Sequence, residues 1–225
     1  MFMYKMYTNI LEVDCSGVIV KEQNGFRKTR STVDHLTSLT SIVETRKMNG
    51  KSTFCAFIDF RKAFNSINRD LLCHKLVRLG LSSKMLAAVK SLYSSIASCV
   101  RLNGCYTDWF SVTTGLRQGC ASSTILFNQY LLLKSFHKGI IIEKKFVFQC
   151  MQSDIVLIAE NENNLQYMLN MLNNLCESNC MSVNVSKSNI VHFRSNDSNR
   201  SKFVFTCGSS TVELCNVIFN TWILV

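Results

Sequence analysis

Apolar residues recur at helical spacing in the stretch from residue 162 to residue 178. Three polar residues, Asn161-Glu162-Asn163, precede the first apolar position, and such residues are typical of a helix N-terminus. The apolar positions follow the i, i+3, i+4, i+7 spacing of one helix face. They are Leu165, Met168, Leu169, Leu172, Leu175 and Cys176. The pattern predicts a helix over 162–178 that buries this face.

Two further helices are predicted between residues 68 and 96. The first runs from Arg69 to Leu79, with Asn68 as its N-cap and Gly80 as its stop. A second helix follows at once, capped by Ser82 or Ser83. Its predicted buried face consists of Leu86, Val89, Tyr93 and Ile96.

Three stretches have the pattern of strands. The run TFCAFIDF (53–60) is almost continuously apolar, which predicts a central strand covered on both faces. In FVFQCMQSDIVLIAE (146–160), two apolar runs enclose the polar turn Gln152-Ser153-Asp154, which predicts a hairpin. In CVRLNGCYTDWFSV (99–112), the Asn103-Gly104 pair predicts a second hairpin with a tight turn.

Helices and strands alternate irregularly along the chain, and this order favours an α+β fold over a doubly wound sheet. No linker, repeat or low-complexity tract divides the sequence, and the most polar loop covers 195–201. We therefore predict a single domain over residues 1–225.

The charge is unevenly distributed. The chain has 225 residues, is 47% hydrophobic and carries a formal net charge of +10. Residues 63–139 hold 9 basic and 2 acidic residues, which gives +7 of that total. A basic segment of this kind suits a polyanion such as nucleic acid, and a solvated basic surface gives the same count.

The N-terminal sequence has no secretory pattern, and no apolar window is long enough for a membrane span. The 11 cysteines are therefore predicted to be reduced thiols in an intracellular protein of the cytoplasm or nucleus. Cys176 and Cys180 lie four residues apart without a nearby histidine, which favours core packing over a zinc site. Proline is absent, which indicates an unusual sequence history.

Two aspartates adjoin predicted buried strands. Asp59 ends the run 53–60, and Asp154 lies in the turn of the hairpin 146–160. Taken singly, Asp59 suits a cap and Asp154 suits a turn. Taken together, a carboxylate at a strand end and another on a hairpin tip form a hard-oxygen site for Mg²⁺, and two such ions serve phosphoryl transfer in polymerases.

Five blocks, in order, resemble motifs of the reverse transcriptases of non-LTR (LINE-like) retrotransposons. They cover the chain from about Glu22 to Trp222. The blocks are EQNGFRKTRSTVDHL, FCAFIDFRKAFNSINRDLL, GLRQGCASSTILFNQYL, MQSDIVLIAE and CMSVNVSKSNIVHF. The order of five blocks is far more specific than any one of them. The resemblance implies RNA-directed DNA polymerase activity, with Mg²⁺ as cofactor and an RNA or DNA template-primer and dNTPs as partners.

The resemblance also implies a right-hand polymerase fold, in which an antiparallel palm sheet is flanked by helices at 121–136 and 162–178. The fingers part is expected over about 1–52. The palm, with interleaved fingers elements, is expected over about 53–225, and the sequence ends where a thumb is expected to begin.

Individual residues match functional positions of the family. Asp59 and Asp154 match metal-binding aspartates, and Lys187 matches the lysine that protonates the pyrophosphate leaving group. The residues that match substrate-binding positions are Arg27 and Arg30 beside the triphosphate, Phe64 as the gate against a ribose 2′-OH, and Gln118 and Gly119 beside the nascent base pair.

The sequence departs from the family pattern at its most critical position. In the hairpin motif YADD, Ser153 replaces the first aspartate, which is the more direct metal ligand of the two. Asn65 also stands where aspartate is common. We therefore predict an impaired enzyme, and the alternative is a non-catalytic relic of a retroelement that at most binds nucleic acid.

Overall fold

The computed structural model of the chain describes residues 31–131, 146–150, 154–194, 199 and 201–218. The chain divides into two compact units. The sheet unit comprises Val20–Arg61 and Leu133–Val225, and the helical unit comprises Met1–Ile19 and Lys62–Leu132. One sheet and its covering helices in one unit, with helices and short hairpins in the other, confirm the predicted α+β class.

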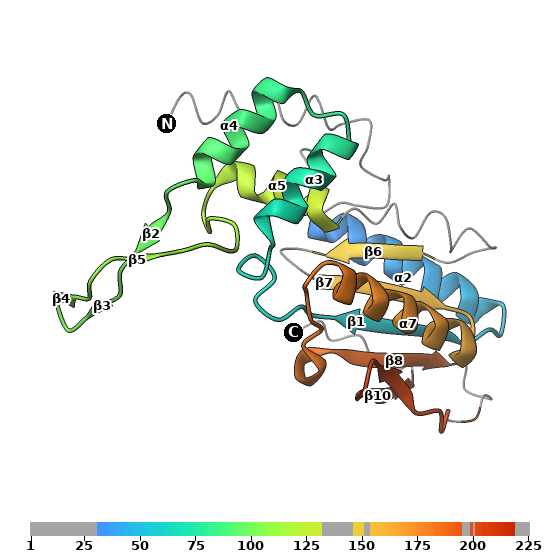
Figure 1. Ribbon diagram of the computed structural model, residues 1–225. Helices are drawn as coiled ribbons and strands as arrows, with labels where there is room; N and C mark the ends of the chain where they lie inside the picture. The colour runs from blue at the N-terminus through green and yellow to red at the C-terminus, as the bar shows by residue number, and fades with distance from the viewer. Residues whose placement is uncertain (1–30, 132–145, 151–153, 195–198, 200, 219–225) are drawn as a thin grey trace. The chain divides into compact units, whose positions relative to one another are not determined.

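The sheet unit is built on six strands in the order β6-β7-β1-β8-β10-β9 (Figure 1). Central strand β1 lies between β7 and β8 and is antiparallel to both. The strands are β1 (Thr53–Ile58), β6 (Phe146–Cys150), β7 (Asp154–Ala159), β8 (Asn189–Arg194), β9 (Phe205–Cys207) and β10 (Ser210–Ile218). Both apolar runs predicted as strands around Asp59 and Asp154 are therefore confirmed.

The prediction of an antiparallel sheet is wrong for one pair of strands. β10 runs parallel to β8, whereas the other four pairs of the sheet are antiparallel. Parallel neighbours need a crossover connection. The chain supplies one between Arg194 and Ser210, where it passes through β9 and turns back into β10.

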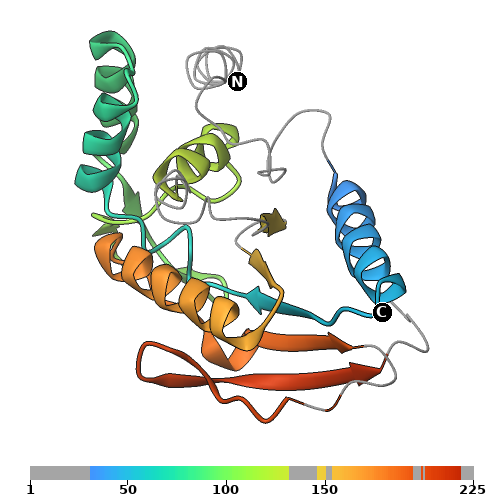
Figure 2. The same ribbon diagram turned by 90° about the vertical axis from the view of Figure 1, so that its right-hand side faces the viewer.

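Helix α7 (Glu162–Ser178) covers one face of the sheet, and α2 (Thr32–Met48) covers the other (Figure 2). The Asn161 side chain caps α7 by accepting from the Asn164 N–H at 2.8 Å. Five of the six apolar positions predicted to face the core are buried, namely Leu165, Met168, Leu169, Leu172 and Cys176. This confirms the predicted helix and its face.

Helix α2 was not predicted. It packs against the sheet through one compact cluster of buried residues, which consists of Leu39, Val43, Cys55, Val156, Ile158 and Phe193. A capping box starts the helix, since the Asp34 N–H donates to Ser31 Oγ and the Ser31 N–H donates to Asp34 Oδ2. Ser-x-x-Asp before a helix is a readable signal, so this sequence feature could have located α2.

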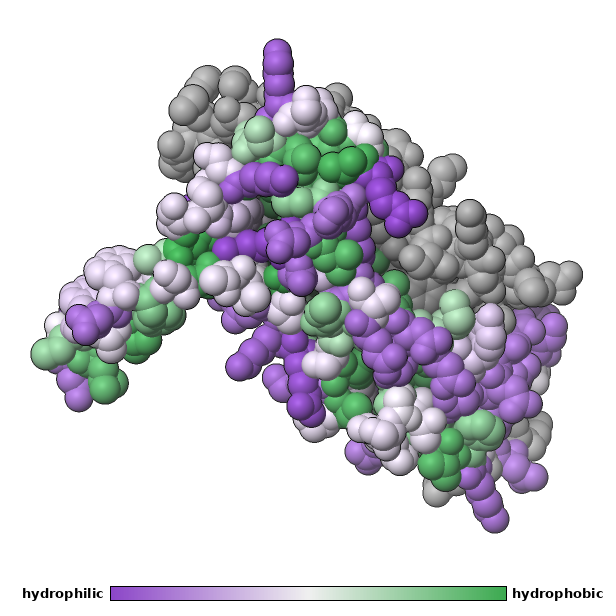
Figure 3. Space-filling view, viewed as in Figure 1, coloured by the Kyte–Doolittle hydropathy of each residue, from purple (hydrophilic) through white to green (hydrophobic). Residues whose placement is uncertain are grey.

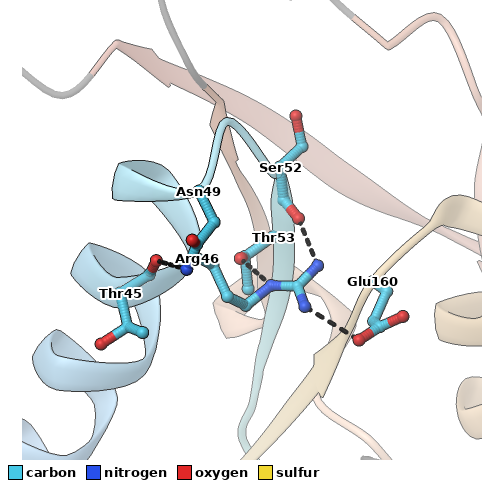
Figure 4. A network of polar contacts seen from close by, with 6 residues as sticks. All are labelled: Thr45, Arg46, Asn49, Ser52, Thr53 and Glu160. Carbon is cyan, nitrogen blue, oxygen red and sulfur yellow. Dashed lines mark hydrogen bonds and ion pairs between the residues drawn. The ribbon is translucent and has the colours of Figure 1, made fainter.

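A polar network joins α2 to the start of β1 and to Glu160, the residue after β7 (Figure 4). The Arg46 guanidinium donates to Thr53 Oγ1 at 2.8 Å, to the Ser52 carbonyl at 2.8 Å and to Glu160 Oε1 at 2.9 Å. Thr53 is buried, whereas the Glu160 side chain is 44% exposed. Most of the stabilisation should therefore come from the contacts to Thr53 and Ser52, because exposed ion pairs contribute little.

We expect Arg46→Met to lower the free energy of unfolding by about 2 kcal/mol, because it removes the donor of the buried Thr53 hydroxyl. Glu160→Gln should cost less than about 1 kcal/mol. Urea denaturation followed by circular dichroism measures both. The exposed Lys51→Met is the matched control, and an equal loss for Glu160→Gln and Arg46→Met would contradict this division.

The helical unit contains α3 (Arg69–Arg78), α4 (Ser83–Tyr93) and α5 (Ala121–Leu131). Asn68 caps α3 by accepting from the Leu71 N–H at 2.9 Å, and Ser82 caps α4 by accepting from the Met85 N–H at 3.4 Å. Both predicted caps are confirmed. The predicted buried face of α4 is partly wrong, since Met85, Val89 and Tyr93 are buried while Ile96 lies beyond the helix end.

A two-tier hairpin connects α4 to α5. Its outer tier pairs β3 (Arg101–Leu102) with β4 (Cys105–Tyr106), and its inner tier pairs β2 (Ala97–Ser98) with β5 (Phe110–Ser111). Asn103 and Gly104 have φ of +48° and +86°, as the predicted tight turn requires. Hydrophobic atoms are exposed on this hairpin (Figure 3), and the residues are Val100, Leu102, Tyr106, Trp109 and Phe110.

None of the helices that the structure describes is both long enough and apolar enough to span a bilayer. Cys176 is buried in α7, which confirms its predicted role in the core. Cys180 is exposed beyond the helix end with φ of +52°, so the prediction of core packing is wrong for this cysteine. The helix ends at Ser178 because Asn179 closes it, with its side chain donating to the Leu175 carbonyl.

Candidate active site

Asp59 directly follows β1 and is fixed on three sides. Its N–H donates to Ser188 Oγ at 3.1 Å, and its carbonyl accepts from the Asn184 N–H at 2.8 Å. Its carboxylate oxygen Oδ2 accepts from Asn184 Nδ2 at 2.9 Å. These three bonds fix the position of half-buried Asp59 and the direction of its carboxylate.

Asp154 is the first residue of β7, which lies beside β1. The β1–β7 register pairs Ile58 with Ile155, so one further step would set Asp59 opposite Asp154. Residues opposite each other on antiparallel strands have neighbouring Cβ atoms on the same face. The backbone therefore brings both aspartates to one end of the sheet. Ser153 and the Asp154 side chain lie outside the described residues.

Lys187 lies at the same end of the sheet unit, in the 3-10 turn η2 (Val185–Lys187). Its side chain is exposed, and its N–H donates to the Asn184 carbonyl at 3.0 Å. Asn184 thus contacts both Asp59 and the turn that carries Lys187. Asn184 and Ser188 were not identified from the sequence, although both flank Lys187 in the SVNVSKS stretch.

Phe64 lies in the helical unit, where its ring stacks on that of buried Phe127 with centroids 4.5 Å apart and planes 15° apart. Its carbonyl accepts from the Leu116 N–H at 2.8 Å. Gln118 Nε2 donates to Asn65 Oδ1 at 3.3 Å. The structure therefore brings the segments around Phe64 and Gln118 together, as their predicted roles beside one substrate require.

Two glycines allow the loop before α5 to take this path. Gly115 has φ of +81°, and a Cβ there would lie 2.8 Å from the Asn65 Cα. Gly119 has φ of +76° with open space around it, so its backbone conformation alone favours glycine. A side chain at 115 would push the loop off the segment that contains Phe64.

Arg69 holds the same loop from the start of α3. Its guanidinium donates to the carbonyls of Val112 at 2.7 Å, Thr114 at 3.0 Å and Gly115 at 2.9 Å. All three acceptors are backbone carbonyls. No side chain in the loop therefore marks these bonds in the sequence, and only the fold reveals them. Arg27 and Arg30, the predicted triphosphate contacts, lie outside the described residues.

The donors present suit a hard divalent cation only in part. Carboxylate oxygens are the ligands that Mg²⁺ prefers. Asp59 offers a carboxylate that is already oriented by the hydrogen bond to its Oδ2. Within the described residues, no group of three or more His, Cys, Asp or Glu side chains could hold a metal ion. Of the two predicted metal ligands, the structure therefore describes the side chain of Asp59 alone.

Comparison with known proteins identifies the class. The profile of the family described as reverse transcriptase (RNA-dependent DNA polymerase) matches residues 1–213. The chain belongs to this family. Solved structures of telomerase share its fold, with a TM-score of 0.59 and 14% identity for Candida tropicalis over 90% of this chain and 41% of that one. Telomerase from Candida albicans gives a TM-score of 0.60 and 13% identity, over 93% of this chain and 36% of that one.

Sequence relatives place it in the non-LTR retrotransposon branch of the family. It is 26% identical over 174 residues to the Pol polyprotein of the R2 element of Popillia japonica, and 23% identical over 161 residues to that of Nasonia vitripennis. These alignments cover 74% and 69% of this chain but 24% and 16% of the relatives. The chain thus spans about a quarter or less of their length. A Xenopus laevis protein of transposon TX1 is 21% identical over 170 residues, which are 70% of this chain and 13% of that protein.

Proposed function

We propose that this chain is the part of a reverse transcriptase that adds deoxynucleotides to a primer paired with an RNA or DNA template. The observation that carries the proposal is the β1–β7 register, which brings Asp59 and Asp154 to one sheet end. That end also holds the turn with Lys187, through Asn184. Carboxylates and a cation in this arrangement suit phosphoryl transfer.

The residues of the sheet unit would divide the chemistry between them. Asp59 and Asp154 would hold Mg²⁺, which, when bound, neutralises charge on the attacking and leaving oxygens. Asp59 would keep one carboxylate oxygen for the cation while Asn184 holds the other. Lys187 would carry the proton that the pyrophosphate takes as it leaves.

The residues of the helical unit and of the N-terminal segment would select and hold the incoming nucleotide. Phe64, backed by the Phe127 ring, would exclude a ribose 2′-OH by its bulk. Gln118 and Gly119 would lie against the nascent base pair. Arg27 and Arg30 would bind the triphosphate, since a guanidinium matches phosphate oxygens in charge and geometry.

We propose further that this copy is catalytically weak, because Ser153 supplies a neutral hydroxyl where the family has a carboxylate. The six-stranded sheet with α7 would correspond to the palm of a polymerase, and the fingers would include residues before 53. The protein would work inside the cell, in the cytoplasm or nucleus, where its template is found.

Binding to nucleic acid is expected to be independent of sequence and to weaken steeply with salt. Between Lys62 and Leu131 the chain has eight basic and two acidic residues, and each phosphate contact releases counterions. Fluorescence anisotropy with two unrelated RNA–DNA duplexes, from about 50 to 200 mM salt, measures this.

The double variant Lys84→Gln/Lys90→Gln removes two exposed charges from α4. It should weaken binding to both duplexes equally and flatten the slope of log affinity against log salt by at most about two. An affinity that stays constant over this salt range would contradict the proposed substrate class.

A further inference from the structure

Asn184 takes part in most of the hydrogen bonds described around Asp59. Its backbone N–H and its side-chain amide both donate to Asp59, at 2.8 and 2.9 Å. Its carbonyl accepts from the Lys187 N–H at 3.0 Å and from Ser188 Oγ at 2.9 Å, and its Oδ1 accepts from Ser186 Oγ at 2.9 Å. One residue therefore joins the aspartate to every position of the turn from Ser186 to Ser188.

The bonds form a closed loop, because Ser188 Oγ also accepts from the Asp59 N–H at 3.1 Å. Asp59 and Asn184 are 125 residues apart, and the pairing of Phe60 with Val183 brings their segments together. The loop fixes the Asp59 backbone at its N–H and its carbonyl, and the bond from Asn184 Nδ2 then orients the carboxylate. Hydrogen bonds to an ionised group are also about twice as strong as neutral ones.

The chemistry of the amide suits this position. Nδ2 carries no charge, so it orients Oδ2 without competing with a cation for the carboxylate, as a lysine or arginine would. Its donor takes one oxygen and leaves Oδ1 for a metal ion. Groups that orient a metal ligand in this way change metal affinity by about tenfold to a hundredfold.

We infer that Asn184 is a positioning residue that holds the Asp59 carboxylate and the Lys187 turn as one unit, so that a divalent cation bound at Asp59 also steadies that turn. The inference rests on the proposed function for the cation site. It assigns Asn184 a role that acts through Asp59 and the Lys187 turn.

The first test is Mn²⁺ binding to the full chain, followed by electron paramagnetic resonance of the free ion. Asn184→Ala should weaken binding roughly tenfold. Asn189→Ala, an exposed asparagine at the start of β8, is the matched control and should leave it unchanged. Equal affinity for the natural chain and Asn184→Ala, when Asp59→Asn abolishes binding, would overturn the inference but leave the proposed cation site intact.

The second test is hydrogen exchange of the peptides that contain residues 57–61 and 184–188. Without metal, Asn184→Ala should speed exchange in both peptides, and Asn189→Ala in neither. Mn²⁺ should slow exchange of 184–188 in the natural chain and in Asn189→Ala but not in Asn184→Ala. Unchanged exchange in Asn184→Ala overturns the positioning role. Faster exchange without any Mn²⁺ binding by the natural chain supports that role and instead overturns the proposed cation site.

Discussion

The natural chain is expected to show no primer extension on RNA or DNA templates with Mg²⁺. Phosphoryl transfer depends on placing cations against the charge that develops on the attacking and leaving oxygens. Ser153 removes one full negative charge from the ligands that would hold them. Losing a single neutral transition-state donor elsewhere costs about a hundredfold to a thousandfold in rate, and a lost metal ligand should cost at least as much.

Ser153→Asp tests the cause of the impairment, and we expect it to restore at most a faint activity. The assay compares the natural chain, Ser153→Asp and Ser153→Asp/Asp59→Asn, each with Mg²⁺ and with Mn²⁺. The double variant is the matched control, because the asparagine substitution keeps the shape of the aspartate without its charge. Ready extension by the natural chain would overturn the prediction, and rescue by Ser153→Asp would identify residue 153 as the site that silences the enzyme.

The stability of the sheet unit is expected to fall steeply above pH 9. Burial raises the pKa of the Cys55 thiol and of the Cys176 thiol from 9.0 to about 12. The folded protein therefore keeps protons that the unfolded chain releases between pH 9 and 12. Their contribution is present in full below pH 9 and is lost as the pH rises toward 12.

Each buried thiol should lower the free energy of unfolding by about 1.4 kcal/mol per pH unit in this window. At pH 10 the two together should therefore lower it by about 3 kcal/mol relative to pH 7. Urea denaturation in a reducing buffer from pH 7 to 10 measures the loss. The variant Cys55→Ala/Cys176→Ala should be less stable at pH 7, because it leaves small cavities, but its stability should decline less with pH. Cys105→Ala/Cys180→Ala replaces two exposed thiols and should decline like the natural chain. Parallel declines in all three proteins would refute this account.

Features fixed by neighbours in sequence could be predicted from the sequence. The caps Asn68, Ser82 and Asn161 each bond to an N–H three residues ahead, so the signal lies within one turn. The Asn103-Gly104 turn likewise depends on its own two residues. The central strand β1 and its neighbour β7 could be predicted because strands buried on both faces are apolar throughout.

Features that depend on distant segments could not be predicted in this way. The parallel pairing of β10 with β8 follows from a crossover, and strand sequences carry no mark of their direction. Asn184 reads as an ordinary polar residue until the fold sets it against Asp59. Helix α2 could have been predicted from the capping residues Ser31 and Asp34. Its apolar positions gave no such signal, because they follow no clear helical period.

The exposed hairpin between α4 and α5 carries an intrinsic fluorophore. Trp109 is 73% exposed there, and the sequence contains two tryptophans in all. Replacing the other one, Trp222→Phe, leaves an indole whose emission arises from the hairpin alone. The emission wavelength of Trp109 and its quenching by iodide then report whether anything covers the hairpin. The measurement needs no attached dye and can be made on the free protein and with a duplex present.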